Sequence, residues 1–156
     1  MQIKSLSIAA AVALALGMGV AQAQTTMGAK PSVDRASKKA DRDKIEADYK
    51  SAKAECSKMK GNEKDVCEAD AKGKENVAKA ELENKYEPSQ AHARKVDEAK
   101  AEHEYKVAKQ KCDEKKGKED SACDKEAKAK YERAKADIKA KYASAERKSA
   151  TGNTSK

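Results

Sequence analysis

Large aromatic side chains are almost absent from this chain of 156 residues. It contains no Trp and no Phe, and its five tyrosines are its only aromatic residues. With so few large apolar side chains, burial at roughly 25 cal/mol per Å² cannot offset a backbone ordering cost of about 1–2 kcal/mol per residue. The composition therefore excludes a conventional core, and a stable fold needs a further constraint.

Recognisable catalytic and ligand-binding patterns are also missing. The absence of a Cys-x-x-Cys pair excludes a thioredoxin-type motif and a zinc ribbon. There is no glycine-rich phosphate loop and no serine in a nucleophile context. His92 and His103 lie 11 positions apart in a polar segment, and we expect both to be solvated. We therefore expect no enzymatic activity, no cofactor and no metal site.

The first 23 residues are typical of a secretory signal peptide. Lys4 precedes an apolar run from Leu6 to Val20, and Ala21-Gln22-Ala23 has the small-x-small form of a cleavage site. We expect cleavage after Ala23 and a periplasmic location. A membrane-spanning helix needs about 20 apolar residues, and this run is shorter. We therefore expect no membrane-spanning segment after cleavage.

Charge is abundant but evenly mixed. The chain has 35 basic and 27 acidic residues, a net charge of +8, and the two signs alternate along its length. Because no single face is evidently basic and the sequence contains no nucleic-acid recognition motif, nucleic acid is not an expected partner. We expect at most weak contact with anionic envelope surfaces, such as lipid headgroups or cell-wall polymers.

Two cysteine brackets organise the remaining sequence. Cys56 and Cys67 enclose ten residues around Gly61, and Cys112 and Cys123 enclose ten around Gly117, 56 positions later. The same offset relates Asp41 to Asp97, Tyr49 to Tyr105, Ala52 to Ala108, Ala71 to Ala127, Ala78 to Ala134 and Tyr86 to Tyr142. We interpret this register as an internal repeat.

Within each bracketed unit the apolar residues have a helical period. The seam of the first unit is Ile45, Tyr49, Ala52, Cys56, Met59, Cys67, Ala71, Ala78 and Leu82, and that of the second includes Cys123, Ala127, Tyr131, Ala134, Ile138 and Tyr142. Acid–lysine pairs four apart are expected on the exposed faces at Glu46–Lys50, Glu81–Lys85, Glu102–Lys106, Glu126–Lys130 and Asp137–Lys141.

These patterns predict an all-α fold of two homologous helical hairpins, antiparallel and coiled-coil-like, with flexible termini. Gly61 and Gly117 are the expected turns, each ending a helix in the left-handed conformation. The expected organisation is a signal peptide at 1–23, a flexible linker at 24–40, hairpins at 41–87 and 97–145, a connector at 88–96 and a disordered tail at 146–156.

The cysteines allow three interpretations. Hairpins turning at the glycines place Cys56 opposite Cys67 and Cys112 opposite Cys123, and small alanine neighbours permit the close approach that a disulfide needs. Unbroken helices folded together at Pro88 would instead join Cys56 to Cys123 and Cys67 to Cys112, resembling the twin-cysteine hairpins of the mitochondrial intermembrane space. Free or metal-binding thiols are the third alternative.

The Lys/Ala/Glu-rich segments from Ala71 to Lys79 and from Glu126 to Lys141 resemble TolA-type cell-envelope proteins. The bracket Cys-…-Lys-Gly-x-Glu-…-Cys is similar to that of PsiF-type phosphate-starvation-inducible periplasmic proteins. The long charged helices and the alanine-lined seams predict a structural or protein-interaction role in the cell envelope, through self-association or an unknown protein partner. The alternative is a periplasmic binding role, as a holdase chaperone or a protein that sequesters metal under stress.

Overall fold

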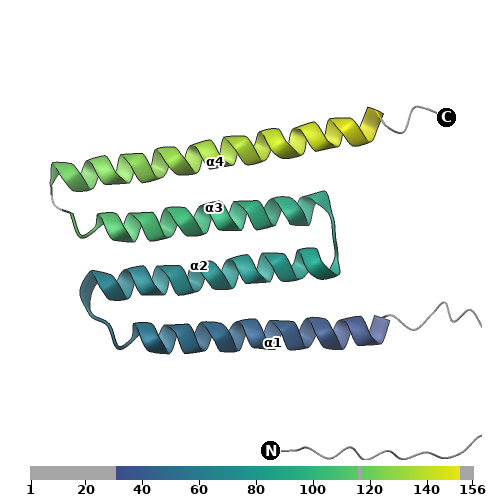
Figure 1. The fold of residues 1–156 in the computed structure, drawn as a ribbon, viewed down its shortest axis with the longest axis horizontal. Coiled ribbons are helices and arrows are strands. Elements are labelled where there is room, and N and C mark those ends of the chain that lie inside the picture. Colours follow the sequence, from purple (N-terminus) through teal and green to yellow (C-terminus); the bar gives the residue numbers. More distant parts are fainter. Residues whose placement is uncertain (1–30, 116, 152–156) are drawn as a thin grey trace, which may run out of the picture.

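The computed structural model describes residues 31–115 and 117–151, which form four α-helices. They are α1 (Pro31–Cys56), α2 (Gly61–Tyr86), α3 (Gln90–Cys112) and α4 (Lys118–Thr151). Consecutive helices run antiparallel and lie side by side in a row (Figure 1). The all-α class and the antiparallel packing of adjacent helices are confirmed. The expected signal peptide lies outside the described residues.

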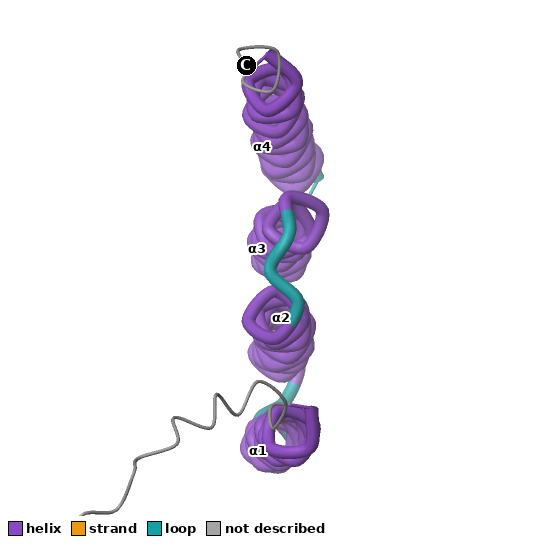
Figure 2. The backbone as a smooth tube through the Cα atoms, turned by 90° about the vertical axis from the view of Figure 1, so that its right-hand side faces the viewer, coloured by secondary structure: helices purple, strands orange, loops and turns teal. Residues whose placement is uncertain are grey.

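The row is one helix thick. Seen from its side, the four helices stack in a single line (Figure 2). Contacts join α1 to α2, α2 to α3 and α3 to α4, and no other pair of described helices meets. A four-helix bundle would enclose a common core, whereas here the described helices leave both broad faces of the layer uncovered.

The core is accordingly divided into strips between neighbouring helices. The α3–α4 strip contains one cluster of Ala101, Ile138 and Tyr142. The buried apolar residues of the layer are Cys56, Ala71, Leu82, Val96, Ala101, Cys112, Ala127, Ile138 and Tyr142. Several of them were placed on the seams by their spacing. In the described part of the chain, no helix has both the length and the apolar character needed to cross a membrane.

Three segment boundaries differ from the prediction. Helix α1 begins at Pro31, so the second part of the expected linker is helical, because proline suits the first helical position, where no N–H is required. Helix α3 begins at Gln90, and the Ser89 hydroxyl caps it by accepting a hydrogen bond from the His92 N–H at 3.1 Å, which shortens the expected connector. Helix α4 continues to Thr151, into the expected tail.

The turns also differ in detail. Gly61 and Gly117 adopt φ values of 56° and 66°, as predicted for left-handed positions. However, Gly61 is the first residue of α2 rather than the end of α1, which already stops at Cys56. Met59 therefore leaves the predicted seam and lies in the turn with 41% of its surface exposed. Helix α3 likewise ends at the first cysteine of its bracket, Cys112.

Candidate functional site

A disulfide joins the two helices of each hairpin, α1 with α2 and α3 with α4, at the turn between them. We call these two turns the clipped turns. Cys56 is bonded to Cys67 and Cys112 to Cys123, with Cα–Cα distances of 5.4 and 5.6 Å. This is the first of the three interpretations of the cysteines, and no cysteine is left free. Both clipped turns lie at the same end of the row, opposite the α2–α3 connection (Figure 1).

At the opposite end of each hairpin, side-chain hydrogen bonds from a lysine and a tyrosine to an aspartate join the two helices. We call each of these clusters a polar tie. The Asp41 carboxylate accepts a hydrogen bond from Lys85 Nζ at 2.6 Å and another from the Tyr86 hydroxyl at 3.0 Å. The corresponding tie in the other pair joins Asp97 to Lys141 Nζ at 2.7 Å and to the Tyr142 hydroxyl at 2.8 Å. Each hairpin is therefore closed at both ends.

The ties correct part of the predicted charge pattern. Glu102–Lys106 and Glu126–Lys130 form within their helices as expected. Lys85 and Lys141, by contrast, bind aspartates on the neighbouring helix. A pattern of spacings within one helix could not reveal this, because it does not show which lysines face a neighbour.

These ties predict a loss of stability in acid. The hydrogen bonds from Lys85 and then Tyr86 lower the pKa of Asp41, and those from Lys141 and then Tyr142 lower the pKa of Asp97 despite its partial burial. A lowered pKa contributes stability above the unfolded value of about 3.9, and that contribution disappears as the pH falls through the folded pKa.

We therefore expect the melting temperature, followed by circular dichroism, to be nearly constant from about pH 7 to 5 and to fall below about pH 4. The Asp97→Asn variant should melt lower at neutral pH and lose less stability in acid than the parent chain. A decline of the same size in the variant would show that Asp97 makes no contribution.

The α2–α3 interface contains a close contact between His103 and Gly73. A Cβ atom placed on Gly73 would lie 2.0 Å from His103 Cδ2, so the imidazole occupies the space that a side chain would fill. His103 Nε2 lies 2.9 Å from an Asp70 carboxylate oxygen, and the His103 side chain is 20% exposed. The prediction that His103 is solvated is therefore wrong. The sequence contains both residues, but it does not show that Gly73 on α2 makes room for the His103 ring on α3.

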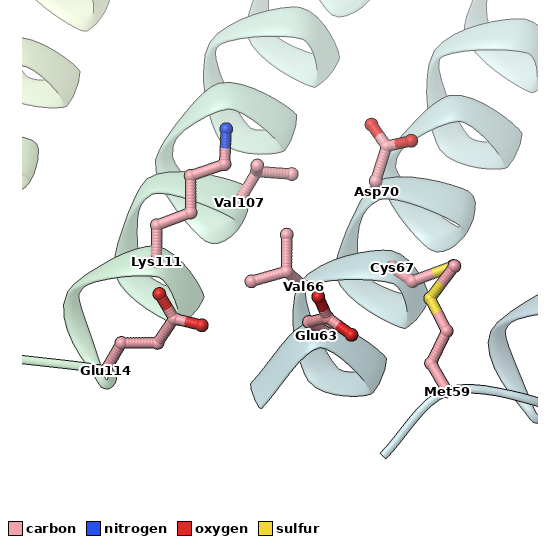
Figure 3. Close-up of a pocket in the computed structure, with 8 residues that line it drawn as sticks. All are labelled: Met59, Glu63, Val66, Cys67, Asp70, Val107, Lys111 and Glu114. Atoms are coloured by element: carbon pink, nitrogen blue, oxygen red, sulfur yellow. The ribbon is translucent and has the colours of Figure 1, made fainter. Parts of the chain in front are cut away.

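An open groove of about 660 Å³ lies between α2 and α3 at the clipped end. Val66 and Val107 lie on its two sides, and Met59 runs up beside Cys67 from the turn (Figure 3). The polar residues along it are Glu63, Asp70, Lys111 and Glu114. The groove combines a small apolar surface with mainly acidic side chains along its edge. This composition suits binding of another molecule more than catalysis.

The described side chains offer no metal centre. Among the side chains that the structure describes, no three from His, Cys, Asp or Glu are grouped closely enough to hold an ion. Asp70 is shared by Lys74 Nζ at 2.6 Å and His103 at 2.9 Å, so its carboxylate is already paired. The chain matches no protein-family model, no curated protein and no solved structure.

Proposed function

We propose that this chain is an exported, non-enzymatic protein with a structural or protein-interaction role in the cell envelope. The observation that carries the proposal is the single layer of helices, in which each described helix meets only its neighbours in sequence. Such a layer exposes a large surface for its length and encloses no shared interior. This shape suits a protein that lies against other molecules.

A periplasmic location is supported by the two disulfides and by the expected signal peptide. Disulfides form and persist in oxidising compartments outside the cytosol. In a chain with so thin a core, they supply the constraint that burial cannot. We propose that the chain leaves the cytosol before the disulfides close.

We also infer that the two hairpins arose by duplication. The disulfides, the left-handed glycines and the Asp–Lys–Tyr ties each recur 56 positions apart. Both hairpins place these features at the same ends. A duplicated hairpin that packs side by side with its copy would extend the layer without requiring a larger core.

The surface favours interaction over a holdase role. A holdase needs a broad apolar surface for unfolded chains, whereas Met59 is the one large hydrophobic side chain that is exposed in the described part of the chain. A metal-sequestering role would need free thiols, and all four cysteines are in disulfides. Specific contact through the charged layer and its groove is the role we propose.

Site-specific photo-crosslinking in intact cells tests this proposal. A photoreactive residue at Met59, on the groove, is expected to give discrete adducts with one envelope protein or with a second copy of the chain. The matched control is Lys115, 56 positions later in the other clipped turn, where the side chain is polar. The proposal fails if neither position gives a discrete adduct, or if both give the same diffuse ladder.

A further inference from the structure

Two hollows, one in each hairpin, are lined by residues at corresponding positions. The hollow between α1 and α2 has a volume of about 330 Å³, and that between α3 and α4 about 80 Å³. Every residue of the first lies 56 positions before a residue of the second. The first is lined by Ile45, Asp48, Tyr49, Ala52, Ala71, Lys74, Glu75 and Ala78, and the second by Ala101, Glu104, Tyr105, Ala108, Ala127, Lys130, Tyr131 and Ala134.

Three of the eight corresponding lining positions differ, and at one of them the larger hollow lacks an aromatic ring. Between α3 and α4, the Tyr131 ring stacks on Tyr105 with centroids 4.8 Å apart and an interplanar angle of 8°. Between α1 and α2, Tyr49 is retained but Glu75 stands where the second tyrosine would be. No aromatic ring stacks on Tyr49 among the described residues. The larger hollow is therefore the space that a stacked ring fills in the other hairpin.

The hollow stays open beside Glu75 because the carboxylate of Glu75 is hydrogen-bonded to two lysines of its own helix, α2. Its side chain is only 5% exposed, and its two carboxylate oxygens accept hydrogen bonds from Lys72 and Lys79, each at 2.7 Å. Burial alone would raise the pKa of Glu75, but the two lysines outweigh it and the pKa is lowered. The carboxylate stays charged and paired, and it does not need a cation from a ligand.

The Tyr49 ring lines the hollow and is approached by the flexible side chain of Lys72. Lys72 Nζ lies 5.1 Å from the Tyr49 ring centroid, and the Lys72 side chain is 51% exposed. The same ammonium donates a hydrogen bond to Glu75, so a ligand that displaces Lys72 leaves that carboxylate with its bond from Lys79. Around the ring, Ile45 and Ala52 supply apolar walls, which favour an uncharged ligand over an ion.

We propose that the hollow between α1 and α2 is a binding site for one neutral aromatic ring, which stacks on Tyr49 as Tyr131 stacks on Tyr105. The ring is carried either by an aromatic side chain of a protein or by a free small molecule, since both present the same face. Offset stacking with ring centroids at this distance is a favoured arrangement of two aromatic rings. The site does not depend on the proposed function in the envelope.

Titration of the full oxidised chain with p-cresol and with the capped peptide acetyl-Gly-Tyr-Gly-amide tests the site. We expect saturable upfield shifts of the Tyr49 ring protons in NMR spectra, at one ligand per chain. The Tyr49→Leu variant should bind about tenfold more weakly. Its matched control, Tyr105→Leu, should retain the parent affinity because that ring belongs to the hairpin already filled by Tyr131.

Exchanging the distinguishing residues provides a second test. Glu75→Tyr should fill the hollow and weaken binding about tenfold. Tyr131→Glu should open a second hollow and raise the stoichiometry to two, because Lys128 and Lys135 stand 56 positions after the lysines that hold Glu75. If circular dichroism shows that Tyr131→Glu unfolds its hairpin, Glu75→Tyr and Tyr49→Leu still decide the question.

The two probes distinguish the sources of the ring. Saturable binding of both supports a site for a protein side chain, and binding of p-cresol alone supports a site for a free small molecule. The proposal is overturned if neither probe shows saturable binding. It is also overturned if Tyr49→Leu and Tyr105→Leu change the affinity equally, because the ligand would then not distinguish the two hairpins.

Discussion

Replacing Cys56 and Cys67 by alanine is expected to lower the free energy of unfolding by about 3 kcal/mol, as the loop-closure estimate for so short a loop gives. This is a large share of the total, because small domains are stable by only about 5–15 kcal/mol. In this chain the core consists of thin strips, so little else compensates. Urea unfolding followed by circular dichroism measures the loss.

The position of the Cys56–Cys67 disulfide also predicts which helix unfolds locally when the disulfide is removed. Helix α1 contacts α2 and no other described helix, so loss of Cys56–Cys67 should accelerate amide hydrogen exchange in α1 while protection in α3 and α4 is retained. The corresponding double replacement of Cys112 and Cys123 is the matched control and should release α4 instead. A reduced and alkylated monomer with unchanged helicity and melting would show that the disulfides do not hold the fold.

Gly73→Ala is expected to destabilise the chain by about 1–3 kcal/mol, although alanine is the better helix former. The added methyl group would meet His103 Cδ2 at 2.0 Å and His103 Cβ at 2.9 Å. Rotation of the imidazole relieves the first contact but not the second, which requires α2 and α3 to separate. Equilibrium unfolding of the variant measures the cost.

A double-mutant cycle with His103→Ala separates overpacking from other effects. In the His103→Ala background, Gly73→Ala should cost less than half as much, because the ring is gone. The comparison position is Ala129, which lies 56 residues later on α4 and is exposed. Ala129→Gly should lose only the helix propensity of alanine, about 1 kcal/mol. Equal costs of Gly73→Ala in both backgrounds would exclude the contact with His103 as their cause.

The local features of the fold were predictable from sequence because they depend on residues close in the chain. The ten residues between Cys56 and Cys67, with Gly61 among them, favour a turn but also fit an unbroken helix, so the pairing of the cysteines stayed open. The helical period placed Ile138 and Tyr142 on a buried seam, and both are buried. The length of α1 was underestimated because Pro31 was interpreted as a linker residue rather than as the first residue of a helix.

The candidate site was predicted less well. Met59 was assigned to the seam but is exposed in the groove, and His103 was assigned to solvent but packs on Gly73. The sequence does not indicate that Glu75 is buried, although it lies 56 positions before Tyr131, which the helical period places on a seam. The assignments of His103 and Glu75 depend on a neighbouring helix, and that of Met59 depends on where α1 ends.

The amino-acid order by itself determined the all-α class, the left-handed glycines and some of the ion pairs within a helix, because these follow from spacings of a few residues. Only the tertiary structure decided that the hairpins form one layer, that Gly73 receives His103 and that Glu75 leaves open the space that Tyr131 fills. The physical reason is that packing between helices depends on which faces meet and how closely their backbones approach, and helical periodicity specifies neither.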